Sequence, residues 1–135
     1  MNIKIIGENT YYTTQKLDVF VQLDLARKLS PATVIVGGLV NPENAGKDKT
    51  ILIVMMLSNL SDEDSRFVVN KCLGTVFRQQ GEGKGAPVMN ANGVLMFDDI
   101  DMTSLLELTA FVLEENIGGF FHTALNGLKA PLATL

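Results

Sequence analysis

The chain has 135 residues, of which 47% are hydrophobic and 19% are charged. This length suits one domain with a single core, and the apolar content argues against a disordered chain. The net charge of -4 and the scattered Lys and Arg residues argue against a nucleic-acid-binding surface.

The N-terminal part predicts a hairpin followed by a helix. Two β-prone segments flank the turn-forming residues 7–9, which predicts an N-terminal β-hairpin over residues 2–14. Four apolar residues then recur at every fourth position: Leu17, Val21, Leu25 and Leu29. This spacing predicts an amphipathic helix with Thr13 or Thr14 as its N-cap, which Pro31 stops or redirects.

Two of the following segments are compatible with either helix or strand. Residues 31–40 begin with a Pro that suits a helix start, but their β-branched residues and glycine pair also allow a strand. Residues 50–57 are apolar on every side, and their leucines and methionines favour a helix. The polar residues 41–49 between these segments predict a solvated loop.

The centre of the chain predicts a capped helix and then a second hairpin. Ser61 is a natural N-cap, and acidic residues fill the first turn after it. The apolar face of this helix follows at helical spacing: Val69, Cys72, Leu73 and Val76, with Phe77 at the helix end. A glycine-rich connector at residues 79–85 leads to two short apolar runs around the turn Asn90–Gly93, which predicts a short hairpin near residues 88–97.

The last long helix is expected to begin after three aspartates, Asp98, Asp99 and Asp101. Ser104 and Glu107 have the spacing of a capping box. The helix carries two apolar stripes, one with Leu105, Leu108 and Val112 and one with Leu106, Ala110, Leu113 and Ile117.

The glycine pair 118–119 is expected to end this helix, and a short apolar segment from Phe120 to Leu125 follows it. Asn126 and Gly127 resemble a C-cap. We therefore expect one globular domain over residues 1–127 and a flexible tail over residues 128–135. The predicted fold class is α+β and mostly α: a small helical domain with an N-terminal β-hairpin and a second short hairpin near residues 88–97.

No set of residues indicates catalysis, a metal or a cofactor. Cys72 and His122 could form a nucleophile and base, but they lie on separate predicted elements, and a buried core thiol is the favoured interpretation. The three aspartates before the last helix could hold a hard cation, although their position at a helix start already accounts for them. In the glycine-rich connector, Lys84 is followed by Gly85 rather than by the Ser or Thr of a phosphate-binding loop.

Cellular location follows from cysteine use and apolar run length. A single cysteine excludes an intramolecular disulfide and fits a reducing compartment. The longest apolar run, residues 51–57, is far shorter than the roughly 20 residues that span a bilayer. We therefore expect a cytosolic protein with no nucleic acid and no membrane among its partners; self-association cannot be read from the sequence.

The second apolar stripe of the last helix allows two interpretations. Core burial is the simpler one, since both faces of a central helix can be covered by the same domain. The alternative is a groove that holds an amphipathic segment of a partner protein. The candidate partner-binding residues in that case are Leu106, Leu113, Ile117, Phe120 and Phe121.

Three runs of the sequence carry a family resemblance: KCLGTVFRQQ, PVMNANGVLMFDDIDM and LLELTAFVLEENIGGFF. They resemble the tail assembly chaperones of long-tailed bacteriophages. The run LDVFVQLDLARKLSP is similar to the same family more loosely, and the loop 41–49 departs from the family pattern in being long. The resemblance therefore covers most of the chain.

This resemblance implies a non-enzymatic protein of the bacterial host cytoplasm that is absent from the mature virion. Such a protein binds the tape measure protein and helps to recruit tail tube subunits during tail morphogenesis. In related phages a longer, frameshifted form makes the contact with the tail tube protein, and this chain would correspond to the short form. The alternative is a structural phage component of the virion, either a head-tail connector or a tail-completion subunit.

Overall fold

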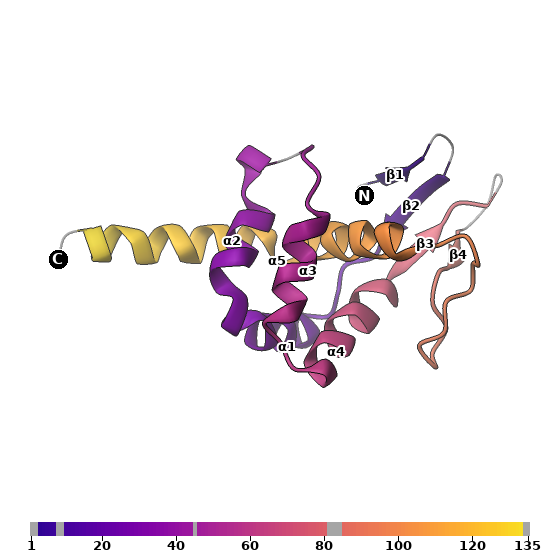
Figure 1. Cartoon of the computed structure of the whole chain (residues 1–135), viewed down its shortest axis with the longest axis horizontal. Coiled ribbons are helices and arrows are strands. Elements are labelled where there is room, and N and C mark those ends of the chain that lie inside the picture. Colours follow the sequence, from indigo (N-terminus) through magenta and orange to yellow (C-terminus); the bar gives the residue numbers. More distant parts are fainter. Residues whose placement is uncertain (1–2, 8–9, 45, 81–84, 134–135) are drawn as a thin grey trace.

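The computed structural model describes residues 3–7, 10–44, 46–80 and 85–133, without the side chains of residues 122 and 124–133. Nine α-helices and β-strands follow one another within these residues, and Figure 1 shows their arrangement. They are β1 (Ile3–Ile6), β2 (Thr10–Thr14), α1 (Val19–Leu29), α2 (Thr33–Val40), α3 (Thr50–Ser58), α4 (Asp62–Leu73), β3 (Val76–Arg78), β4 (Ala86–Pro87) and α5 (Met102–Ala133). Two 3₁₀ turns, Ser30–Ala32 and Pro42–Asn44, flank α2. The predicted fold class, α+β and mostly α, is confirmed.

The four strands form one antiparallel sheet in the order β1-β2-β3-β4. The N-terminal hairpin is confirmed, with Ile6 paired to Thr10 across its turn. The prediction that Val76 and Phe77 end the preceding helix is wrong, because both residues lie in β3 and pair with β2. Pairing with β2 satisfies the backbone of these residues and leaves the Val76 side chain in the core.

Helix α5 runs through the middle of the molecule, and Figure 1 shows α2 and α3 crossing it. It packs against α1, α2, α3, α4 and β1. Leu108, Val112 and Leu113 are completely buried along its length. Both predicted apolar stripes of this helix therefore contribute to the core, since other elements cover it on more than one side.

The predicted helix end at Gly118 and Gly119 is wrong, since α5 continues to Ala133. Two interior glycines cost a helix about 2 kcal/mol relative to alanine. Burial of Ile117 and Phe121 on either side of the pair outweighs that cost. Gly118 lies close to α2, where an added Cβ would contact the Cβ of Val40 at 3.6 Å. The C-terminal end of α5 projects beyond the other helices (Figure 1).

The residues immediately before α1 and α4 accept hydrogen bonds from backbone N–H groups in the first turn of each helix. Ser61 Oγ accepts a hydrogen bond from Asp64 N at 3.1 Å, which confirms the predicted cap of α4. Helix α1 is capped by Asp18, whose Oδ1 accepts from Phe20 N at 2.7 Å. The predicted caps Thr13 and Thr14 lie instead in β2.

The start of α5 also differs from the prediction by one turn. Asp101 Oδ1 accepts a hydrogen bond from Ser104 N at 2.8 Å, and this bond lowers the pKa of the Asp101 carboxyl. Ser104 is therefore inside the helix, and the predicted capping box of Ser104 and Glu107 is wrong. An acidic side chain at this position also interacts favourably with the helix dipole.

The two ambiguous segments are both helical, as α2 and α3. Between them, Gly46 adopts a φ of 81°, and Asn44 Nδ2 donates to Gly38 O at 2.7 Å. The second hairpin consists of a turn closed by an isolated bridge between Met89 and Leu95. Residues 81–84 of the glycine-rich connector lie outside the described residues.

Arg78 fastens the segment that follows this turn to the sheet. Its guanidinium donates to both carboxylate oxygens of Asp99, at 2.6 and 2.7 Å. It also lies 4.6 Å from the centre of the Phe97 ring and 5.9 Å from that of Tyr12. The hydrogen bonds from Arg78 lower the pKa of the Asp99 carboxyl. Two of the three aspartates before α5 are thus engaged in local structure, Asp99 with Arg78 and Asp101 with the helix start.

In the part of the chain that the structure describes, no helix is long and apolar enough to cross a membrane.

Candidate functional site

The five predicted partner-binding residues divide into a buried and an exposed group. Leu106, Leu113, Ile117 and Phe121 are buried, whereas 62% of Phe120 is exposed. The rings of Phe120 and Phe121 meet edge to face, with their centres 5.4 Å apart. The structure thus brings Ile117, Phe120 and Phe121 together at one end of the packed part of α5, and it places Leu106 and Leu113 in the core. The role of these residues in partner binding stays a prediction.

An apolar groove lies between α1 and α5 at this position. The α1/α5 groove has a volume of about 210 Å³ and is lined by Val19, Gln22, Leu23, Ala26, Ile117 and Phe120. None of these side chains is charged, and Val19, Leu23 and Phe120 are each more than half exposed. Such a surface can bury apolar side chains of a second molecule.

Hydrogen bonds fix the position of α1 relative to α5. Leu17 N donates to Asn116 Oδ1 at 2.7 Å, and Asn116 Nδ2 donates to Val112 O at 2.9 Å. Gln22 Nε2 donates to Leu17 O at 2.9 Å. Because these bonds tie the segment before α1 directly to α5, the two walls of the α1/α5 groove are held at a set spacing.

The sequence analysis missed the α1 side of the groove. The core residues Leu25 and Leu29 belong to the apolar stripe that identifies α1. Val19, Leu23 and Ala26 follow one another at intervals of four and three residues, so they form a second apolar stripe on the same helix. This second stripe is the feature of the sequence that could have identified the α1 side of the groove.

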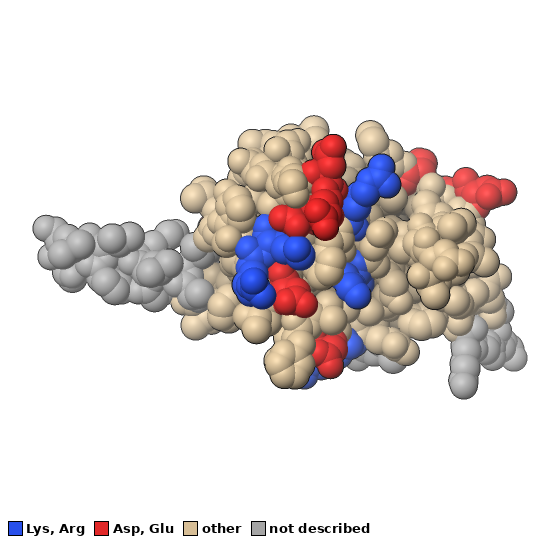
Figure 2. Space-filling model, turned by 90° about the horizontal axis from the view of Figure 1, so that it is seen from below, with Lys and Arg blue, Asp and Glu red and all other residues tan. Residues whose placement is uncertain are grey.

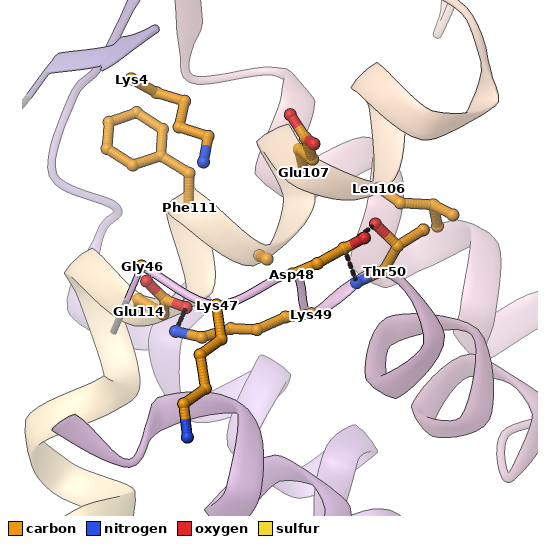
Figure 3. Close-up of a pocket in the computed structure, with 11 residues that line it drawn as sticks. Lys4, Gly46, Lys47, Asp48, Lys49, Thr50, Leu106, Glu107, Phe111 and Glu114 are labelled. Carbon is orange, nitrogen blue, oxygen red and sulfur yellow. Dashed lines mark hydrogen bonds and ion pairs between the residues drawn. The ribbon is translucent and has the colours of Figure 1, made fainter. Parts of the chain in front are cut away.

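A second cleft, of about 140 Å³, lies between the loop before α3 and the middle of α5 (Figure 3). Asp48 Oδ1 accepts hydrogen bonds from Thr50 Oγ1 at 2.6 Å and from Thr50 N at 2.9 Å, which lower the pKa of the Asp48 carboxyl. Lys49 forms an ion pair with Glu114 of α5. These contacts join the loop to α5 and to the start of α3, so the cleft is a structural junction.

Cys72 has no exposed surface, and burial raises the pKa of its thiol far above the ordinary value. A thiol that stays protonated is a poor nucleophile. The side chain of His122 lies outside the described residues. Among the described residues, no group of three or more His, Cys, Asp or Glu side chains could hold a metal ion.

The charged side chains on the face seen in Figure 2 are mixed in sign. Lys and Arg residues alternate with Asp and Glu residues, and they leave large uncharged areas between them. This face therefore offers no extended field of one sign for a polyanion.

The chain is thus a small α+β domain with an uncharged groove between two of its helices. Comparison with protein families matches residues 8–129 to the phage tail assembly chaperone proteins, abbreviated TAC. The chain belongs to this family. No curated protein and no solved structure matches it significantly.

Proposed function

We propose that this tail assembly chaperone binds an amphipathic helix of the tape measure protein in the α1/α5 groove. The observation that carries the proposal is the uncharged lining of this groove together with the exposure of Val19, Leu23 and Phe120. A long helical protein exposes apolar stripes before assembly, and such stripes promote aggregation. A groove that covers them by apolar contact alone binds reversibly and needs no nucleotide.

The binding mode that fits the groove is a helix laid against two others. An amphipathic helix presents apolar residues at positions i, i+3, i+4 and i+7, and one or two of these side chains can enter a groove of this size. The proposed chaperone acts without catalysis in the bacterial host cytoplasm, helps to recruit tail tube subunits, and leaves before the virion is complete.

The test is co-expression of the tape measure protein with chaperone variants. We expect Phe120→Asp and Leu23→Asp to lower affinity for the tape measure protein by about 10- to 100-fold, since each removes a side chain whose burial contributes about 1.5–3 kcal/mol. The amount of soluble tape measure protein recovered from these co-expressions should then be lower than with the wild type. Affinity is measured with purified chaperone and a soluble tape measure fragment.

The matched control is Phe20→Asp. Phe20 is also on α1 and is 75% exposed, but it does not line the groove. All three variants should keep the circular dichroism spectrum of the wild type. Equal binding by wild type, Phe120→Asp and Leu23→Asp would show that the groove is not the binding site. Aspartate at Leu113 or Phe121 would be a poor test, because a buried charge would unfold the domain.

Purified virions separate the chaperone from a structural component. A chaperone is present during assembly and absent from finished particles, whereas a head-tail connector or a tail-completion subunit stays in them. Detection of this chain at a fixed copy number in purified virions would contradict the proposed role.

A further inference from the structure

The sheet has an outer face with exposed apolar side chains. In an antiparallel sheet, paired residues point to the same face. Tyr12 pairs with Lys4 and Arg78, and its burial identifies the face that packs on the core. The opposite face carries Ile3, Ile5 and Tyr11, which are 61%, 53% and 43% exposed, with Ile5 directly opposite Tyr11.

The two edges of this sheet differ in how well they are protected from pairing with a further strand. The β4 edge is only two residues long and ends in Pro87, which has no N–H to donate. The β1 edge has four residues without proline, and within the described residues it pairs only with β2. Figure 1 shows β1 at the margin of the sheet. Short edges and prolines are devices that prevent further strand pairing. Both are present at β4, whereas β1 lacks proline and has one charged residue, Lys4, on the face that packs on the core.

We propose that β1 pairs with β1 of a second copy of this chain, so that two four-stranded sheets form one continuous antiparallel sheet. The exposed face of each copy must continue onto that of the other, because one face of the sheet is buried in each molecule. This condition selects registers that place a residue opposite its own copy. Of these, the registers centred on Ile5 and on Lys4 pair the most residues of the four-residue strand β1.

Charge decides between these two registers. Pairing centred on Lys4 sets two ammonium groups directly opposite each other, which is destabilising. Pairing centred on Ile5 sets Ile5 against Ile5 of the second copy and Lys4 against Ile6. It also joins Tyr11, Ile5 and the same residues of the second copy into one apolar row across the new sheet. The strand sequence is therefore complementary to itself in one register.

The contact is small, which sets its strength. It comprises a four-residue strand and three exposed apolar side chains from each copy. Specific interfaces that bury less than about 1,200 Å² in total are generally weak or transient. The proposal is therefore a reversible dimer that forms as the protein concentration rises into the micromolar range.

The sheet and the α1/α5 groove involve different residues, so a dimer would carry two free grooves.

The first test places a single cysteine on β1 and leaves the native Cys72, which is buried. In the Ile5→Cys variant, the cysteines of the two copies would lie opposite each other. Their Cα atoms would be about 4.5–5.5 Å apart, a distance that a disulfide can bridge. With Ile3→Cys, the two cysteines would be four residues out of register, or about 13 Å apart.

We expect Ile5→Cys to form a disulfide-linked dimer under mild oxidation and Ile3→Cys to remain monomeric. If Lys4→Cys formed disulfide-linked dimers more readily than Ile5→Cys, the proposed register would be wrong. In analytical ultracentrifugation, the mass of the wild type should double with rising concentration, whereas Ile5→Lys should stay monomeric. Val34→Lys, on the exposed start of α2, is the control and should behave like the wild type.

A wild type that remains monomeric at millimolar concentration, together with failure of Ile5→Cys to cross-link, would overturn the second-copy proposal. If Ile5→Lys also lost binding to the tape measure fragment while the wild type stayed monomeric, the β1 edge would belong to that partner instead. Failure of the groove variants to affect binding would leave the dimer unaffected, so the two proposals can fail independently.

Discussion

Replacing Leu113 with alanine tests whether α5 is the centre of the core. Leu113 is completely buried on α5, within the cluster formed by the helices around it. Truncation of a buried leucine to alanine costs about 2–5 kcal/mol, from lost burial and from the cavity that remains. The free energy of unfolding of a domain is only about 5–15 kcal/mol. The change should therefore remove a large part of the stability.

The assay is urea unfolding followed by circular dichroism. With a slope of about 1.5 kcal/mol per M, a loss of about 3 kcal/mol lowers the unfolding midpoint by about 2 M. The control is Leu23→Ala, the same substitution at a side chain that is 53% exposed, which should change stability by about 0.5 kcal/mol or less. Equal effects of the two substitutions, or a loss below about 1 kcal/mol for Leu113→Ala, would refute the central position of α5.

Three further predictions concern local structure. Ser61→Ala should lower the free energy of unfolding by about 1 kcal/mol in urea unfolding, because it removes the cap of α4. The Cys72 thiol should react with a thiol reagent only at the rate of unfolding, and fast reaction in the native state would contradict its burial. NMR titration should give Asp99 a pKa below its ordinary value, restored by Arg78→Gln. Because that pKa is lowered, this carboxylate stabilises the fold above its ordinary pKa and ceases to do so as the pH falls through the lowered value.

Elements with local signals could be predicted from the sequence. The turn at Gly7 between two β-prone runs identified the first hairpin, and Ser61 before three acidic residues identified α4. Elements that depend on distant partners could not. Val76 continues a helical pattern, and only the free edge of β2 explains why it lies in a strand. Gly118 and Gly119 are poor helix formers, and only the packing of Ile117 and Phe121 explains why α5 continues through them.

The candidate site was only partly visible in the sequence. Phe120 was identified from its apolar neighbours, but burial cannot be read from a helix with two apolar stripes, since core and interface residues look alike. The α1 side of the groove depends on which face of α1 meets α5. The hydrogen bond from Leu17 N to Asn116 joins residues 99 positions apart, and no local pattern predicts such a contact.

The order of synthesis gives the central position of α5 a further consequence. The element around which the others pack follows all of them in the chain, so it leaves the ribosome after them. Until α5 emerges, α2 and α3 lack the helix against which both of them pack. Contacts between sequence-distant elements form late because their chain segments must first be brought together. The nascent domain should thus stay incompletely folded until α5 has left the ribosome.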